Sequence, residues 1–136
     1  MKSILLISAA LFSSITFAAP SRCEMGRISE TNMRLANYYN SQAASSFSVD
    51  CSGKYRIRFN SRNLQDTSGS SFVTNGPIKL KTRMTVSGAM ENLWNVSTEQ
   101  GAGKNNYVIA VRLVERVNAT TPAGIYRDTV FVNMVF

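Results

Sequence analysis

The sequence predicts an all-β domain in which two antiparallel sheets pack face to face. Three observations lead to this fold class: short segments alternate apolar and polar residues, turn-forming residues separate these segments, and no long amphipathic helix is visible. About seven such segments can be distinguished, which suits a two-sheet sandwich. No internal repeat or linker divides the chain, so we expect a single domain.

The earliest clear strands are expected at residues 47–51 and 54–59. In the second of them apolar residues alternate with basic ones, so one face should be buried and the other wet. A short apolar run follows at residues 72–73. The cleanest pattern covers residues 78–86, directly after a turn signal at 75–77, and repeats the alternation of apolar and basic side chains.

The later part of the chain is expected to contain a weaker strand at residues 93–96 and a glycine-rich polar loop at 99–106. Continuous apolar character over residues 107–114 predicts a strand that is covered on both faces. The last strand is expected over residues 125–136. Residues 25–44 fit either a helical turn or an irregular strand, and the sequence leaves both readings open.

The N-terminus has the pattern of a secretory signal peptide. A basic residue precedes an apolar run that ends at Phe17 and is too short to span a bilayer. Cleavage after Ala18 leaves small residues at both required positions, whereas cleavage after Ala19 would place Phe17 at one of them. We therefore expect a signal peptide over residues 1–18, a mature domain over residues 19–136, and export through the periplasm. No other stretch is apolar enough to predict an integral membrane protein.

Cys23 and Cys51 are the two cysteines of the chain. In an exported protein two cysteines most often form a structural disulfide, and two free thiols are the less favoured alternative. A metal site is less favoured still, since the chain has no histidine and no Cys-x-x-Cys spacing. The disulfide should stabilise the fold by roughly 3 to 4 kcal/mol.

The mature chain should be basic. Of 15 Lys and Arg residues, 14 remain once Lys2 is removed with the signal peptide, against 8 Asp and Glu, so the net charge is +6. Such a charge attracts acidic polymers, but basic side chains also keep a sheet protein soluble and discourage edge pairing, which is the simpler explanation. A nucleic-acid partner is not expected, because exposed aromatics do not alternate with the charges. The candidate face for a polyanion consists of Arg56, Arg58, Lys79, Lys81 and Arg83.

Catalysis is not expected, and neither is a cofactor. Acid–base and nucleophilic chemistry rely on paired groups, whereas this chain has no histidine and only scattered carboxylates. Residues 101–104 look like part of a phosphate loop but lack the Walker A spacing, so we interpret them as a flexible connection. Two glycosylation sequons, at Asn95 and Asn118, are short enough to arise by chance.

The most informative pattern lies in the last predicted strand. Nothing follows Phe136 in the sequence, whereas an immunoglobulin-like sandwich normally closes with one further strand beside this one. We therefore expect an uncovered sheet edge and an apolar groove. A last strand that simply docks in its own sheet is the alternative. The residues expected to share the groove face are Tyr126, Val130, Val132, Met134 and Phe136.

Two segments resemble a known family, the spore coat protein U domain, which includes the archaic (Csu-type) chaperone-usher pilins. Residues 124–129 follow a Gly-x-Tyr-x-Asp-Thr pattern after a turn rich in Pro, Ala and Gly, and residues 49–53 follow a Val-x-Cys-x-Gly pattern. The resemblance implies an incomplete immunoglobulin-like domain. Its missing strand would come first from a periplasmic chaperone and then, after passage through an outer-membrane usher, from the N-terminal extension of a neighbouring subunit.

The resemblance also implies roles for single residues. Val130, Val132, Met134 and Phe136 would line the groove that accepts the partner strand, and the chaperone would hold the terminal carboxylate of Phe136. One departure concerns the donor segment, since only residues 19–22 lie between the predicted cleavage site and Cys23. At about 3.3 Å per residue these four residues span some 13 Å, too short to fill such a groove.

Two functions are therefore weighed. The leading hypothesis is a structural or adhesive subunit of a surface fibre, placed at the tip or at the start of assembly because it accepts a strand but cannot donate one. The alternative is a self-sufficient secreted sandwich that binds polyanions through its basic face. The first protein should aggregate without its chaperone, because its edge is unpaired, while the second should be a stable monomer.

Overall fold

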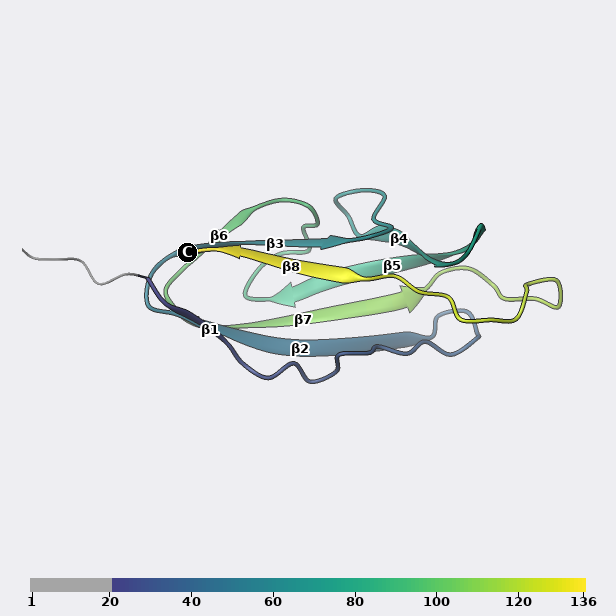
Figure 1. The fold of residues 1–136 in the computed structure, drawn as a ribbon, viewed down its shortest axis with the longest axis horizontal. Helices are drawn as coiled ribbons and strands as arrows, with labels where there is room; N and C mark the ends of the chain where they lie inside the picture. Colours follow the sequence, from purple (N-terminus) through teal and green to yellow (C-terminus); the bar gives the residue numbers. More distant parts are fainter. Residues whose placement is uncertain (1–20) are drawn as a thin grey trace, which may run out of the picture.

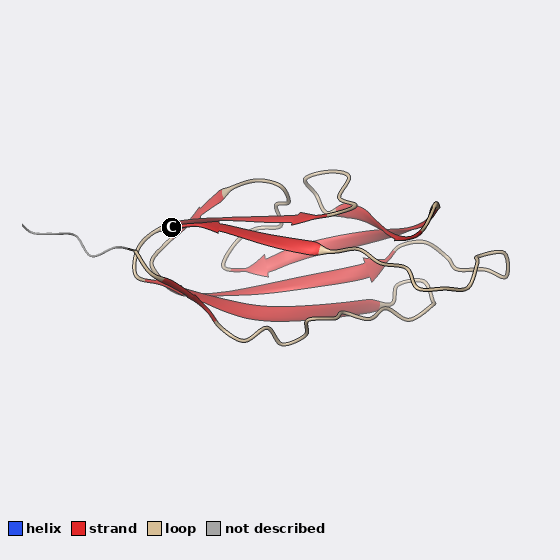
Figure 2. Cartoon of the chain, in the orientation of Figure 1, coloured by secondary structure: helices blue, strands red, loops and turns tan. Residues whose placement is uncertain are grey.

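The computed structural model describes residues 21–136, and this part of the chain consists of strands and loops (Figures 1 and 2). No helix in this part is long and apolar enough to cross a membrane. The predicted signal peptide lies outside the described residues. The eight strands are β1 (Cys23–Met25), β2 (Gln42–Cys51), β3 (Tyr55–Ser61), β4 (Ser70–Asn75), β5 (Ile78–Gly88), β6 (Thr98–Gln100), β7 (Gly103–Leu113) and β8 (Val130–Val135).

The strands form two antiparallel sheets that lie on either side of one core (Figure 1). The larger sheet has five strands in the order β1-β2-β7-β5-β4, and the smaller has three in the order β6-β3-β8. Every pair of neighbouring strands is antiparallel. The predicted all-β, two-sheet sandwich is confirmed, and it is consistent with an immunoglobulin-like arrangement.

Alternation of side chains explains the two clearest strands. In β3, Ile57 and Phe59 are completely buried, while Arg58 between them is exposed. In β5, Met84 and Val86 are buried and the residues between them are exposed. Successive side chains of a strand point to opposite sides, so each sheet turns one apolar face towards the other sheet.

Four aromatic rings hold the two sheets together. Tyr107 of β7 stacks on Phe47 of β2 at 5.4 Å between ring centroids and packs against Phe59 of β3 at 5.6 Å. Trp94 meets the edge of Phe59 at 6.2 Å and is completely buried, and its indole N–H donates a hydrogen bond to the side-chain oxygen of Asn92. Rings of this size bury more apolar area than any other side chain, so this cluster is the centre of the core.

Trp94 occupies a loop, and the strand predicted at residues 93–96 is wrong. The backbone turns here: Asn95 has a positive φ of 56°, and its N–H donates to the carbonyl of Phe59. This turn directs the indole into the core. A strand forms instead at β6, which overlaps the start of the loop expected at residues 99–106, and β7 begins within that loop at Gly103.

β7 is covered on one face only, which corrects the prediction for residues 107–114. Tyr107 and Ile109 are buried, but Val108 is exposed and Ala110 is half-buried on the outer face of the sheet. The apolar run reflects the central position of β7 between β2 and β5, where small and β-branched residues suit the pleated surface.

Residues 26–30 form neither a helix nor a regular strand but run along the edge of β2. The N–H of Gly26 donates to the carbonyl of Ser48, and the N–H of Ser29 donates to that of Ser46. β2 itself begins at Gln42, five residues before the predicted start. The irregular segment therefore covers the β2 edge of the larger sheet beyond the short β1.

The last strand is shorter than predicted. β8 comprises Val130–Val135, and residues 125–129 are irregular apart from one bridge. In that bridge Arg127 exchanges two backbone hydrogen bonds of 2.9 Å with Thr74 of β4. Because β4 belongs to the five-stranded sheet and β8 to the three-stranded one, this segment must pass from one sheet to the other, and it cannot continue as a straight strand.

Candidate functional site

β8 lies at the edge of the three-stranded sheet, with β3 as its one neighbour (Figure 1). Its residues pair in register with β3 from Val130 opposite Ser61 to Val135 opposite Arg56. Along the other side of β8 no strand pairing or backbone hydrogen bond occurs within residues 21–136. We call this side the free edge of β8.

The hydrogen-bond pattern shows which residues face the free edge. The N–H of Arg62 donates to the carbonyl of Thr129 at 2.9 Å, so these two opposite residues are a hydrogen-bonded pair. In an antiparallel ladder such pairs alternate with non-bonded ones. Phe131, Asn133 and Val135 therefore bond to β3. Val130, Val132 and Met134 direct their N–H and C=O groups outwards, which leaves three donors and three acceptors on the free edge.

The same three residues also point their side chains into the sandwich. Val130, Val132 and Met134 pack against the core cluster but are only half-buried. The inward-facing residues of the neighbouring strand, Ile57 and Phe59, are completely buried. The core is therefore incompletely covered beside β8, where the backbone is also unpaired.

The edge of the larger sheet shows a similar incomplete cover. Cys23 of β1 and Met33 of the segment after it pack against the core cluster and remain half-buried. Met25 and Ile28 are exposed. Met33 is not predictable as a core residue, because residues 26–41 have no periodic pattern that would assign a side chain to the core.

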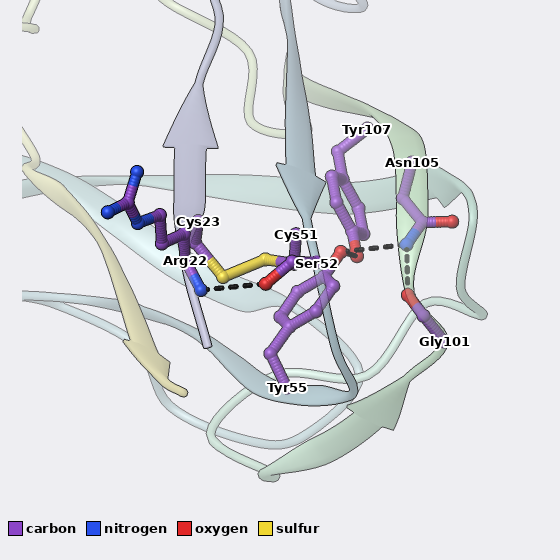
Figure 3. Close-up of a disulfide and its surroundings, with 8 residues drawn as sticks. All are labelled: Arg22, Cys23, Cys51, Ser52, Tyr55, Gly101, Asn105 and Tyr107. Carbon is purple, nitrogen blue, oxygen red and sulfur yellow. Dashed lines mark hydrogen bonds between the residues drawn. A yellow bond between two sulfur atoms is a disulfide. The ribbon is translucent and has the colours of Figure 1, made fainter. Parts of the chain in front are cut away.

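The disulfide between Cys23 and Cys51 is confirmed (Figure 3). The two cysteines lie directly opposite each other in the β1–β2 register, with 4.1 Å between their Cα atoms. Pairing continues beyond them, because Arg22 donates its N–H to the hydroxyl of Ser52 and Ser52 donates its N–H to the carbonyl of Arg22. The disulfide thus holds the three-residue β1 on the sheet.

A buried hydroxyl pair lies at the same end of the sandwich (Figure 3). The hydroxyl oxygens of Tyr55 on β3 and Tyr107 on β7 are 2.6 Å apart, and the side-chain amide of Asn105 donates to Tyr55 and to the carbonyl of Gly101. Burial, together with the hydrogen bond shared with Tyr55, raises the pKa of Tyr107 above its usual range. The pair joins the two sheets by a polar contact.

Asp128 ties the start of β8 to the rest of the sandwich. One carboxylate oxygen accepts hydrogen bonds from the backbone N–H groups of Asn63 and Thr129, at 3.1 and 2.8 Å. The other accepts a hydrogen bond from the hydroxyl of Ser71 on β4 at 2.7 Å. This is the Asp of the Gly-x-Tyr-x-Asp-Thr segment, so that part of the motif fixes where β8 begins.

Three of the five predicted groove residues lie on β8, and the other two lie outside the strand. Val130, Val132 and Met134 lie together on β8, as described above. Tyr126 lies before the strand, where its hydroxyl donates to the carbonyl of Pro122 at 2.7 Å, and Phe136 follows the strand and is 60% exposed. The face over which the five residues were expected to be continuous exists for the middle three only.

The predicted polyanion face is not formed as one surface. Arg56 and Arg58 lie on β3 of the three-stranded sheet, whereas Lys79, Lys81 and Arg83 lie on β5 of the five-stranded sheet. All five are exposed on the outer side of their own sheet, so the two groups point away from each other. Alternation along a strand predicts which residues are exposed but not which sheet the strand joins.

No family model matches the chain, and no curated protein matches it. Among solved structures, its fold is similar to that of a chain in the crystal structure of the CsuC–CsuE chaperone–tip adhesion subunit pre-assembly complex, from archaic chaperone-usher Csu pili of Acinetobacter baumannii. The TM-score is 0.54 at 21% sequence identity, over 86% of this chain and 40% of that one. The present chain therefore spans about two fifths of the length of the chain it matches, and what the two chains share is the fold.

Proposed function

We propose that the chain is a structural or adhesive subunit of a surface fibre, and that a partner strand completes its sandwich along the free edge of β8. The partner is first a periplasmic chaperone and then a neighbouring subunit, with an outer-membrane usher between the two steps. The observation that carries the proposal is the coincidence, at Val130, Val132 and Met134, of unpaired backbone groups with half-buried apolar side chains.

Strand addition uses both properties of this edge. Main-chain hydrogen bonds to the outward N–H and C=O groups supply affinity, and alternate side chains of the added strand fill apolar space to fix its register. An unpaired apolar edge is otherwise a site of aggregation. A subunit built in this way needs a partner before it leaves the compartment in which it folds.

Two further observations support the proposal. The fold is similar to that of a chain from a chaperone–subunit complex of a pilus, which favours a chaperone as the first partner. The disulfide between Cys23 and Cys51 favours an oxidising compartment, as in the periplasm or at the cell surface. We assign the chain no catalytic activity and no cofactor, in keeping with a sequence that has no histidine.

The position of the subunit within the fibre stays a prediction. The expectation of a tip or initiating subunit depends on residues 19–22, and residues 19 and 20 lie outside the described part of the chain. Deletion of residues 19–22 should leave incorporation into fibres unchanged, and loss of incorporation would show that this segment donates a strand.

The free edge can be tested with a proline at Val132. The N–H of Val132 faces the free edge, so Val132→Pro removes one donor for the partner and leaves the β3–β8 ladder intact, a position where edge strands tolerate proline. Asn133→Pro is the matched control, since the N–H of Asn133 bonds to β3. The chain is exported with and without a candidate chaperone and analysed by size-exclusion chromatography and amide hydrogen exchange.

We expect the unchanged chain to elute as a complex with the chaperone and to aggregate without it. Val132→Pro should retain the disulfide and the protected amides of β3 but should not be captured, whereas Asn133→Pro should disrupt the sheet itself. A lone, stable monomer whose amides at Val130, Val132 and Met134 exchange slowly would contradict the proposal, because the edge would then be covered by the chain itself.

A further inference from the structure

Four cationic side chains gather on the outer face of the five-stranded sheet. Lys79, Lys81 and Arg83 are exposed on β5, and half-buried Arg112 lies on β7. We call these four residues the cationic cluster. Arg83 and Arg112 come from two adjacent strands in the interior of the sheet order, so their charges are not needed to block pairing at a sheet edge.

Arg83 and Arg112 are direct neighbours. They lie opposite each other in the β5–β7 register, which brings two like charges together on one face. Such a pair destabilises a sheet unless an anion compensates it. Within residues 21–136 the one ion pair joins Lys54 to Glu99, which lie by the other sheet. The nearby carboxylate of Glu115 accepts a hydrogen bond from the backbone N–H of Lys81, and the structure pairs it with no cation.

Two hollows flank Arg83. The first has a volume of about 330 Å³ and the second about 220 Å³, and Arg83 contributes to the wall of both. Both hollows are open to solvent. Besides Arg83, the first is lined by Gln65, Ser70, Phe72 and Lys81, among others, and the second by Gln42, Thr85 and Arg112, among others.

The chemistry of this lining suits an acidic sugar chain. The side-chain amides of Gln42 and Gln65 and the hydroxyls of Ser70 and Thr85 can bond to sugar hydroxyls. Arginine binds carboxylates through two parallel N–H groups. Adjacent hollows with a shared arginine suit a polymer whose carboxylates recur from one sugar to the next. We propose that the cationic cluster binds a carboxylated polysaccharide, with uronic acid residues in the two hollows.

A nucleic acid fits this surface less well. Binding of single strands relies on exposed aromatic rings on which bases stack. The aromatic side chain of the cluster region is Phe72, and the ammonium group of Lys79 lies over its ring, 5.4 Å from the centroid. The ring is half-buried and already occupied by a cation.

The proposed site is independent of the free edge. β8 belongs to the three-stranded sheet, whereas the cationic cluster lies on the outer side of the opposite sheet. A strand added beside β8 would extend the smaller sheet and leave the cluster exposed. The inference therefore goes beyond the proposed function and can fail or succeed without it.

The test measures binding of the full exported chain, purified with any chaperone that accompanies it, to immobilised polygalacturonate. Single-stranded DNA and neutral dextran serve as the other polymers, all at about 0.15 M salt. The site variant is Arg83→Gln with Arg112→Gln. Its matched control is Arg56→Gln with Arg58→Gln, which removes the same charge from the other sheet. Arg83→Lys keeps the charge but loses the two-pronged geometry.

We expect the site variant to bind polygalacturonate about tenfold or more weakly and the control pair to stay within about twofold of the unchanged chain. Arg83→Lys should fall between them. Equal losses in both arginine pairs, full affinity in Arg83→Lys, tighter binding of DNA than of polygalacturonate, or no binding by the unchanged chain would each overturn the proposal.

Discussion

The hydroxyl groups of Tyr55 and Tyr107 form a buried polar contact between the two sheets. Each tyrosine comes from a different sheet, and both rings are almost fully buried. Their hydroxyls would be costly to leave without partners, and the 2.6 Å contact satisfies both. The pair therefore stabilises the packing of the two sheets at the end where the disulfide lies.

Tyr107→Phe should reduce stability at neutral pH. Tyr55 keeps the hydrogen bond from Asn105 but loses the one to Tyr107, so we expect a loss of about 1 kcal/mol in the free energy of unfolding at pH 7, measured by urea denaturation. Tyr55→Phe leaves the Tyr107 hydroxyl with no other partner in the structure and should cost more. Equal stability of all three proteins would contradict a bond between the hydroxyls.

The same pair predicts how stability depends on alkaline pH. The pKa of Tyr107 is raised in the folded protein, mainly by burial, while in the unfolded chain it lies near 10. Below about pH 10 both states keep the proton and stability is unaffected. Above it the unfolded state loses its proton first, so stability falls as pH rises. Tyr107→Phe should lose less stability than the unchanged chain between about pH 10 and 11, and parallel curves would exclude this origin.

At the scale of elements, the position of β8 depends on contacts at its start. Asp128 accepts three hydrogen bonds, from Asn63, Thr129 and Ser71, immediately before the strand. Removal of the carboxylate in Asp128→Ala leaves these three donors without it, and we expect a loss of about 2 to 3 kcal/mol. Asp128→Asn can still accept the two backbone bonds and should lose less. Chemical denaturation measures both, and faster amide exchange at Phe131 would show that β8 itself is loosened.

The sequence predicted elements well where a period of two was visible. β3 and β5 alternate clean apolar and basic residues, and both lie close to their predicted bounds. Trp94 was assigned to a strand because a short apolar run looks the same in a strand and in a loop that inserts one ring into the core. Residues 125–129 were assigned to β8 because their crossing between sheets depends on Thr74, a residue distant in the sequence.

The candidate site was predictable in part for the same reason. Alternation predicts that Val130, Val132 and Met134 share one face of the strand, and in the structure all three side chains pack against the core cluster. It could not assign Arg83 and Arg56 to different sheets, since strand order depends on long-range packing. Arg112 was missed because it lies within an apolar run, and its position opposite Arg83 follows from the register of β5 and β7.

At the scale of the whole molecule, the disulfide closes a chain segment that includes β1, the irregular residues after it, and β2. We expect the double variant Cys23→Ser with Cys51→Ser to lose roughly 3 to 4 kcal/mol of unfolding free energy, a large part of the stability of a domain of this size. The unchanged chain should match it once a reductant is added to the denaturation buffer. Stability that is insensitive to both treatments would show that β1 is held by other contacts.

The alternation along β8 limits which partner strands can bind beside it. The residues that offer hydrogen bonds sideways are also the residues that present apolar side chains inwards. If the register of the added strand shifted by one residue, all of its apolar side chains would face solvent. The register of the added strand can therefore change only by an even number of residues. Its sequence must alternate apolar and polar residues along its whole length.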